Sequence, residues 1–534
     1  MLSYSFHDIP QEISHWGKEY LKDDSLYRIV GDQLLSLISE DEFICEFASM
    51  YSHTGRPSMN PIILSFVTIF QFLEEIPDRV AAQYVMSRLD WKYALHIPMY
   101  APGFHYSDLC NFRKRLAKHG KESLLFDQFL KQIESLGFLK KRKHQRTDST
   151  HVLAVVGELS RLENLSENLR VSLRAIHKSD SDFYKMKIPA LYREHWVIPQ
   201  SDYQMTDSQR REALDRAGQD IYWLLSFLET NKKSFLRLPE LEVLQTLFYQ
   251  QFSLQDSPHS PQVCLKDKAD TGKDKIQSPH EPEARYSEKR GKLWIGYKIH
   301  ITETANEKGE VNFITDITTT NSCEQDNETL SGIQEKLEAG NLKPQQQFTD
   351  KGYVTGTNLS ESHKKNIQLM GEASQLNNKG SFTADDFIVD YQTRTATCPS
   401  GCTSISWKKR ESGKHNGDIQ IRFGHQCNHC SLKEKCTSSK RGRRLRLNLH
   451  YQMLKKRRQE SKTDAFKKLM KRRPPVEGTI SEMVRAHGLR TSRYRGMMKT
   501  HFHGLMIGTA VNLKRLIKAI SLSKNNQNQQ LANT

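Results

Sequence analysis

The chain has 534 residues, of which 37% are hydrophobic, so it is long enough to form two or three domains with apolar cores. Lysine and arginine number 79 against 62 aspartates and glutamates, which gives a net charge of +17 and an isoelectric point near 9.3. A basic excess of this size favours a polyanionic partner, and nucleic acid is the commonest one. A basic protein without such a partner is the alternative, and the placement of the charges decides between the two.

The composition also argues against secretion and membrane insertion. The start of the chain lacks the basic leader and apolar stretch of a signal peptide. The longest apolar stretch, residues 61–73, is shorter than the ~20 residues that span a bilayer. Nine cysteines in an intracellular chain do not indicate a disulfide framework. We therefore expect a cytoplasmic protein that makes no membrane contact.

Residues 1–135 predict a helical domain. Apolar side chains recur at helical spacing over residues 34–38, 62–73, 80–89 and 109–116. The pattern changes after residue 146, where the short β-branched segment 147–153 predicts a strand. Residues 158–252 return to helical spacing, and the polar segment 253–286, with four prolines, predicts a loop.

Strands return after this loop. Residues 295–301 alternate between apolar and polar side chains and pair in a predicted hairpin with residues 311–319. A helix over 330–337 and short strands at 347–349 and 367–370 follow. Residues 385–440 contain cysteines in strand-like segments, and the chain is helical from residue 461. The last dozen residues are rich in Asn and Gln and are expected to be disordered.

Without its two inserts, the second part of the chain has the order β-β-β-α-β-β-α, which is that of a ribonuclease-H-like domain. The predicted fold class is therefore an α+β multidomain protein. An all-α N-terminal domain (1–135) precedes a ribonuclease-H-like α/β core (140–520), which is interrupted by a mostly helical insert (157–285) and a Cys-rich insert (385–440). Residues 521–534 form the disordered tail.

This strand order brings acidic residues together. An acid in the first strand, a second after the fourth strand and a third on a late helix meet at one sheet edge, and Asp148 and Asp350 hold the first two places. Such a trio suits two divalent cations ~4 Å apart, and carboxylates are the oxygen ligands that Mg²⁺ prefers. A single Asp in a strand or turn is usually structural. Four basic runs, at 140–146, 440–446, 455–458 and 471–473, flank these acids and favour the metal site.

The third acid is a choice between Glu477 and Glu482 in one predicted helix. They lie five residues apart, roughly 140° around a helix, so both cannot face one metal site. Pro474 and Pro475 suit a helix start, which places Glu477 in the first turn, and Arg473 lies one turn before it. We therefore favour Glu477, against the alternative that this glutamate only stabilises the helix.

Several segments, in order, resemble the DDE transposases of bacterial insertion sequences in the branch with a ribonuclease-H-like core. They are residues 51–57, 91–95, 112–116, 147–150, 296–300, 348–353, 476–481 and 485–496. The resemblance covers nearly the whole chain. It implies cleavage at the ends of a mobile element, followed by attack of the freed 3′ hydroxyl on target DNA. It also implies that Asp148, Asp350 and Glu477 are catalytic and ligate Mg²⁺ or Mn²⁺.

The same resemblance implies the partners. They are the double-stranded DNA of the terminal inverted repeats, the target DNA, and a second copy of the chain in a homodimeric synaptic complex associated with the bacterial nucleoid. The N-terminal helical domain would bind element ends or assemble the complex. The basic residues around and after the third acid are expected to contact DNA: Arg473, Arg485, Arg490, Arg493, Arg495 and Lys499.

The chain departs from the family pattern at two places. Many relatives have a tyrosine and a lysine at fixed spacing around the third acid, but here Met470 and Val484 stand at these positions. Arg485 follows one residue later and could still reach a phosphate.

Five of the nine cysteines lie between residues 398 and 436. A structural zinc site needs four ligands in tetrahedral geometry, and CxxC is a common half-site. We favour a zinc site formed by Cys398, Cys427, Cys430 and Cys436, with Cys402, His425 and His429 as possible replacements. A set of reduced, buried thiols is the alternative.

Two other functions are compatible with the same residues. One is a decayed or domesticated transposase that only binds DNA, and the other is a structure-selective nuclease on the same fold. The intact Asp148, Asp350 and Glu477 set favours the enzyme over the first. Strand transfer in addition to cleavage distinguishes a transposase from the second.

Overall fold

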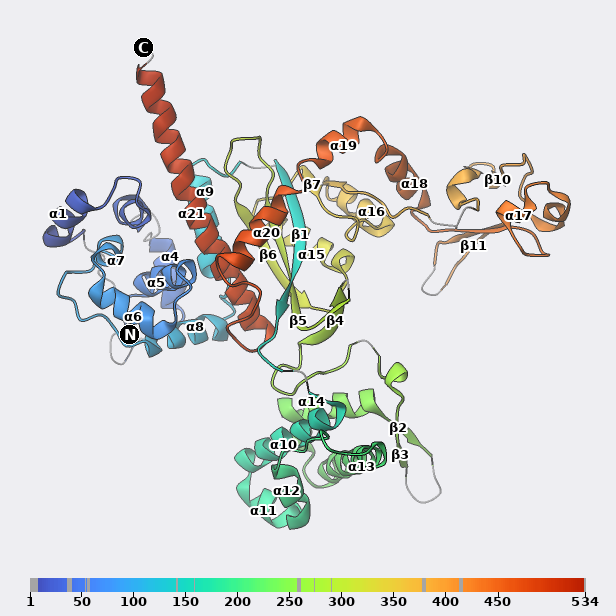
Figure 1. Ribbon diagram of the computed structural model, residues 1–534, viewed down its shortest axis with the longest axis horizontal. Coiled ribbons are helices and arrows are strands. Elements are labelled where there is room, and N and C mark those ends of the chain that lie inside the picture. The colour runs from blue at the N-terminus through green and yellow to red at the C-terminus, as the bar shows by residue number, and fades with distance from the viewer. Residues whose placement is uncertain are drawn as a thin grey trace.

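A computed structural model describes residues 8–35, 41–52, 54, 58–140, 143–157, 159–256, 261–272, 274–289, 291–376, 381–412 and 416–532. A central body contains the main sheet and the long helix α21 (Met497–Ala532), while a helical insert and a Cys-rich module extend from it in different directions (Figure 1). In this part of the chain, no helix combines the length and the apolar character needed to cross a membrane.

The N-terminal part is helical, as predicted. Its helices are α1 (Gln11–Tyr20), α2 (Leu26–Ile29), the π-helical turn η1 (Val30–Leu34), α4 (Asp41–Ala48), α5 (Pro61–Leu73), α6 (Asp78–Ser87), α7 (Leu89–Ala94), α8 (Ser107–Lys118) and α9 (Leu124–Ser135). Most of the helix predicted over 34–38 lies outside the described residues, as does part of the segment 51–57. Helix α5 begins where Asn60 Oδ1 accepts the N–H of Ile62 and Pro61 takes the first turn.

The main sheet has the strand order of a ribonuclease-H-like core. Its strands are β1 (His144–Leu153), β4 (Arg285–Lys289), β5 (Lys292–Thr304), β6 (Ile314–Asn321), β7 (Gln346–Phe348) and β8 (Gln368–Met370). Strand β5 pairs with β1, with β4 and with β6, while β7 and β8 extend the sheet from the other edge of β1. Strands β1, β7 and β8 are parallel, and β5 is antiparallel to β1. Gly296 is required in β5, because a Cβ atom there would lie 2.1 Å from the Val152 carbonyl oxygen.

Helices on both faces complete the core: α15 (Asp326–Ala339), α16 (Gly356–Lys364), α20 (Pro475–Arg485) and α21. The predicted order lacked α16 and was wrong there, since the core has a helix between β7 and β8. Strand β4 and a hairpin of β2 (Phe252–Gln255) and β3 (Gln262–Leu265) also replace parts of the loop predicted over 253–286.

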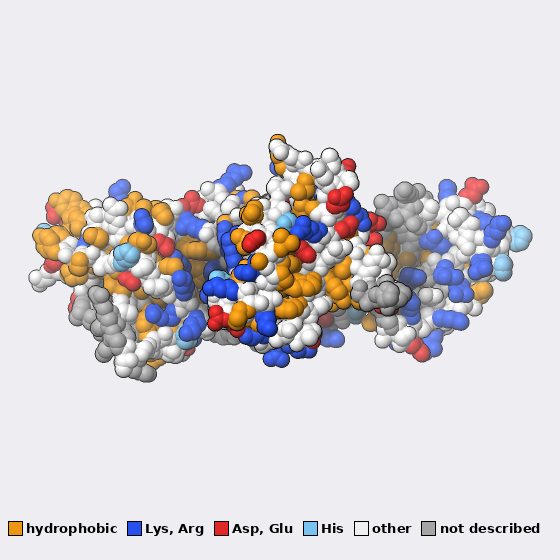
Figure 2. All heavy atoms as spheres, turned by 90° about the horizontal axis from the view of Figure 1, so that it is seen from below, with side chains coloured by type: hydrophobic (Ala, Val, Ile, Leu, Met, Phe, Trp, Pro, Cys, Tyr) orange, Lys and Arg blue, Asp and Glu red, His pale blue; other side chains and the backbone are white. Residues whose placement is uncertain are grey.

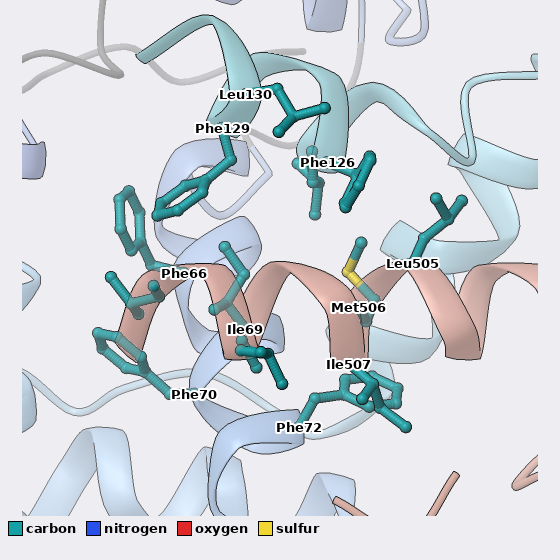
Figure 3. Close-up of a cluster of buried hydrophobic side chains, with 14 of the residues drawn as sticks. Phe66, Ile69, Phe70, Phe72, Phe126, Phe129, Leu130, Leu505, Met506 and Ile507 are labelled. Atoms are coloured by element: carbon teal, nitrogen blue, oxygen red, sulfur yellow. The ribbon is translucent and has the colours of Figure 1, made fainter. Parts of the chain in front are cut away.

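The N-terminal helices and the sheet share one hydrophobic core through α21. Side chains of α5, α9 and α21 interdigitate in it (Figure 3). Gly504 and Gly508 let α21 approach the sheet, since a Cβ on Gly508 would lie 2.4 Å from Ile317 Cδ1. The boundary predicted at residue 135 therefore does not separate two cores.

The helical insert forms its own core. It comprises α10 (Arg161–Ser179), α11 (Ser181–Lys187), α12 (Ala190–Val197), α13 (Asp207–Asn231), η2 (Lys233–Arg237), α14 (Pro239–Gln251) and η3 (Lys268–Thr271). Capping boxes at Ser160 and Thr206 begin α10 and α13.

The Cys-rich module has a smaller core of its own. It comprises η4 (Ala384–Asp386), β9 (Ile388–Asp390), β10 (Thr395–Thr397), β11 (Ser406–Lys409), β12 (Ile419–Arg422), η5 (Gly424–His429), α17 (Lys433–Cys436) and β13 (Arg444–Leu447). Helices α18 (Tyr451–Glu460) and α19 (Asp464–Met470) lead from it to α20. The prediction of a disordered tail from residue 521 is wrong in the described part, because α21 continues to Ala532.

Candidate active site

The register of the parallel strands places Asp148 and Asp350 side by side. The last register pair of β1 and β7 is Arg146 with Phe348, and each aspartate lies two residues beyond this pair, Asp148 still within β1 and Asp350 after the end of β7. Strands in a sheet lie about 4.8 Å apart, so the two carboxylates leave the same edge of the sheet together. Asp148 Oδ1 accepts the N–H of Ser149 at 2.8 Å, and Asp350 Oδ1 accepts the N–H of Gly352 at 2.8 Å.

Helix α20 brings Glu477 to these aspartates. The helix begins at Pro475, as predicted from its prolines, and Glu477 lies in the first turn with 63% of its side chain exposed. A buried carboxylate, Glu303 of β5, fastens the helix to the sheet: its Oε2 accepts the hydroxyl of Thr479 at 2.6 Å. Arg146 of β1 donates to Glu303 at 2.7 Å and to the Arg472 carbonyl at 2.9 Å, which also fixes the segment before the helix.

Arg473 connects the first and third acids. Its guanidinium lies 2.7 Å from Asp148 and 3.2 Å from Glu477. Burial raises the pKa of Asp148, and the charges of Asp350 and Glu477 raise it further, while Arg473 and the Ser149 N–H act in the opposite direction. The three acids therefore lie within electrostatic range of one another. Among the described residues, no three His, Cys, Asp or Glu side chains are placed closely enough to bind a metal ion in their present positions. At this site, Arg473 lies between the carboxylates of Asp148 and Glu477.

Glu482 faces away from this group. It pairs with Lys514 at 2.9 Å and Arg515 at 3.2 Å, both on α21. Burial raises the pKa of Glu482, but these two cations outweigh burial and leave it below its usual value. Its partners give Glu482 a structural role between α20 and α21.

A buried hydrogen bond holds the segment after Asp350. His300 Nδ1 lies 2.6 Å from the hydroxyl of Tyr353, three residues beyond Asp350, and both side chains are fully buried. Burial lowers the pKa of His300 to about 4, so the ring is uncharged at neutral pH and its Nδ1 can accept a hydrogen bond from the tyrosine hydroxyl. Both residues lie in segments of the family resemblance, but their contact could not be read from the sequence.

The predicted DNA-contacting residues fall into two groups. Arg490 donates to the His151 carbonyl, and Arg493 donates to the Ile76 carbonyl at 3.2 Å and packs over Phe72. Arg485, Arg495 and Lys499 are exposed, and none of them has an ion-pair partner among the described residues.

The basic run 455–458 is largely structural. Arg457 and Arg458 are buried; they donate to the Leu369 carbonyl at 2.6 Å and to Asp385 at 2.5 Å. Lys455 donates to the Asp385 carbonyl at 3.0 Å. These three side chains of α18 bind the Cys-rich module and the sheet, so their charges are not available to bind DNA.

The two departures from the family pattern have apolar surroundings. Met470 packs against the small cluster that includes Phe348 and Phe466, and Val484 packs against the main core. Both positions therefore contribute packing in this chain.

Five cysteines line one small cavity of the Cys-rich module: Cys398, Cys402, Cys427, Cys430 and Cys436. The backbone N–H of Cys402 donates to Cys398 Sγ at 3.3 Å, and that of Arg443 donates to Cys427 Sγ at 3.4 Å. The neighbouring Cys398 raises the pKa of the Cys402 thiol. All five cysteines are free thiols.

Two family models match separate parts of the chain. A family model described as a transposase DDE domain matches residues 397–517, which include Glu477 and the cysteine cluster, and a second, described as a transposase domain, matches residues 19–115. No curated protein and no solved structure matches the chain. Each model covers less than half of the chain, and together they indicate a DNA transposase with a DDE domain, a class of enzyme whose reactions depend on divalent metal.

Proposed function

We propose that Asp148, Asp350 and Glu477 are the catalytic residues of this transposase and ligate Mg²⁺ or Mn²⁺. The observation that carries the proposal is the position of Asp148 and Asp350, each two residues beyond the last β1–β7 register pair, with Glu477 of α20 joined to Asp148 through Arg473. Three carboxylates from separate elements form an all-oxygen donor set, which fits a hard cation. When bound, the cations would activate the attacking oxygen and stabilise the leaving oxygen of a phosphodiester.

The chain's own residues position the DNA for this reaction. Arg473 lies against Asp148 and Glu477, where its planar guanidinium can bind a phosphate in two-point fashion. Arg485, Arg495 and Lys499 supply exposed cations beyond the third acid for the backbone on either side. Cleavage at the terminal inverted repeats and attack of the 3′ hydroxyl on target DNA are both in-line phosphoryl transfers, so one site serves both.

Conservative substitutions test the assignment. Asp148→Asn and Asp350→Asn each remove a charge without a change of shape, so we expect metal-dependent cleavage of element-end DNA to be lost. Binding of the same DNA should be retained or tightened, because a repulsion between carboxylate and phosphate is removed. Loss of binding in both variants would instead mark these aspartates as structural.

We also propose that a synaptic complex contains two copies of the chain. Light scattering of the protein with and without element-end duplex tests this: a mass of two chains on the DNA supports it, and one chain per pair of ends refutes it.

A structural zinc ion in the Cys-rich module is a further proposal, supported by the shared cavity of the five thiols and the two N–H···S contacts. Protein expressed with zinc and dialysed should contain one zinc per chain, and Cys427→Ser with Cys430→Ser should lose it. An absence of zinc from the parent protein would leave the cluster as reduced thiols.

A further inference from the structure

The three-stranded sheet of the Cys-rich module has two faces of opposite character. Strands β11, β12 and β13 pair antiparallel, and register partners point to the same face. One face carries Trp407, Ile421 and Leu445, and it covers the core of the module.

The opposite face is cationic. One row of register partners contains Ser406, Arg422 and Arg444, and the next contains Lys408, Gln420 and Arg446. All four cations are exposed, and no carboxylate of the described residues pairs with any of them. Adjacent strands lie about 4.8 Å apart, so the four charges lie close together on one flat surface. Figure 2 shows Lys and Arg side chains over the right-hand lobe, which is this module.

Repulsion between these like charges destabilises the folded module. Arg422 and Arg444 lie directly opposite each other on neighbouring strands, and like charges at such positions destabilise a sheet. A polyanion on this face removes the repulsion and gains four charge-assisted contacts. The buried arginines of α18 show the contrast, since they have carbonyl and carboxylate partners inside the protein.

We propose that the face formed by Lys408, Arg422, Arg444 and Arg446 binds the sugar–phosphate backbone of the duplex DNA on which the transposase acts. This inference rests on the proposed function for its substrate. Its contacts go to phosphates and carry no sequence information, so they position the duplex without selecting the terminal repeat. The face is separate from the basic residues that follow Glu477.

The test is the salt dependence of binding to a fluorescently labelled duplex of arbitrary sequence, without divalent metal. The variant replaces Lys408, Arg422, Arg444 and Arg446 with Gln. We expect the slope of log K against log salt to become shallower by about 2 to 4, since each lost phosphate contact accounts for ~0.9. An unchanged slope would overturn the proposal.

Two matched controls separate a local effect from a general one. Replacing Arg174, Lys178, Lys185 and Lys187 with Gln removes the same charge from exposed positions on α10 and α11 of the helical insert. An equal change of slope in this control would overturn the proposal, because net charge alone would then explain it. The second control, Arg422→Lys, Arg444→Lys and Arg446→Lys, keeps the charge and should keep the slope.

The readout is independent of the catalytic assignment. Asp148→Asn is expected to abolish cleavage and leave the slope as it is, whereas neutralising the cationic face changes the slope in the parent and in the Asp148→Asn protein alike. Far-ultraviolet circular dichroism checks that the variants fold. A shallower slope of log K against log salt supports the proposal when the variant has the same spectrum as the parent protein.

Discussion

Glu303 is the residue on which the position of the third acid depends most. It is fully buried and accepts from Arg146 at 2.7 Å and from Arg515 at 2.9 Å, in addition to Thr479. Glu303→Gln removes the charge and keeps the shape. It leaves Arg146, with 5% of its side chain exposed, without its carboxylate partner in the protein interior.

Removing one partner of a buried ion pair costs about 3 to 5 kcal/mol. This loss of stability weakens the contacts between α20, α21 and the sheet. The amide hydrogens of α20 should therefore be less protected against exchange with solvent. We expect their exchange to accelerate about 100-fold or more, since each 1.36 kcal/mol is a factor of ten. Cleavage should fall as well, because Glu477 is then held less firmly beside Asp148.

The assay is hydrogen–deuterium exchange followed by mass spectrometry of peptides from α20. Glu307→Gln is the matched control: Glu307 is 72% exposed and pairs with Arg472 at 2.8 Å, and surface pairs contribute only ~0–1 kcal/mol. Equal exchange of α20 in the Glu303→Gln and parent proteins would refute the reasoning, and so would an equal effect of both substitutions.

Three further predictions concern other parts of the structure. Glu477→Gln should lose metal-dependent cleavage while Glu482→Gln keeps most of it; the opposite result would move the third acid. Tyr353→Phe removes the hydroxyl that is hydrogen-bonded to His300 and holds the segment after Asp350. The loss of about 1 kcal/mol should raise the Mn²⁺ concentration for half-maximal cleavage by about fivefold. An unchanged Mn²⁺ titration would contradict this. Burial raises the pKa of Asp316 to about 6, so the folded chain binds this proton more tightly than the unfolded chain does. The free energy of unfolding should therefore be highest below pH ~4 and fall by about 3 kcal/mol as the pH rises through about 6. Asp316→Asn should therefore resist urea more than the parent at pH 8 but not at pH 4, and equal stabilisation at both would count against it.

The sequence predicted the elements whose pattern is local. The alternation in residues 295–301 predicted β5, and the prolines before Glu477 predicted the start of α20. Helix α16 was missed because Leu359 is its one large apolar residue, so no periodicity marks it; its start depends on Thr355, which accepts the N–H of Asn358 at 3.1 Å. Helix α21 extends into the polar tail because each added residue of a formed helix gains a backbone hydrogen bond at little cost.

The site was predictable only in part for a similar reason. Asp148 lies in a strand and Asp350 follows one, and the order of the strands suggested that they meet. The links between distant segments could not be read from the chain, because they depend on how the elements pack. Arg146 with Glu303 and His300 with Tyr353 are examples, and both join residues more than fifty positions apart.

Helix α21 has a consequence for when the protein can fold during its synthesis. Its side chains fill the space between α5, α9 and the sheet, so the faces of these helices that pack against α21 are covered only after nearly 500 residues have been made. At about 5 to 20 residues per second, α9 waits about 20 to 80 s for its partner. A product truncated before Met497 would leave Phe72 without Phe502 and the sheet residue Ile317 without α21, and would be open to aggregation and proteolysis. A chain released before α21 is made therefore lacks the packing that joins the N-terminal helices to the sheet.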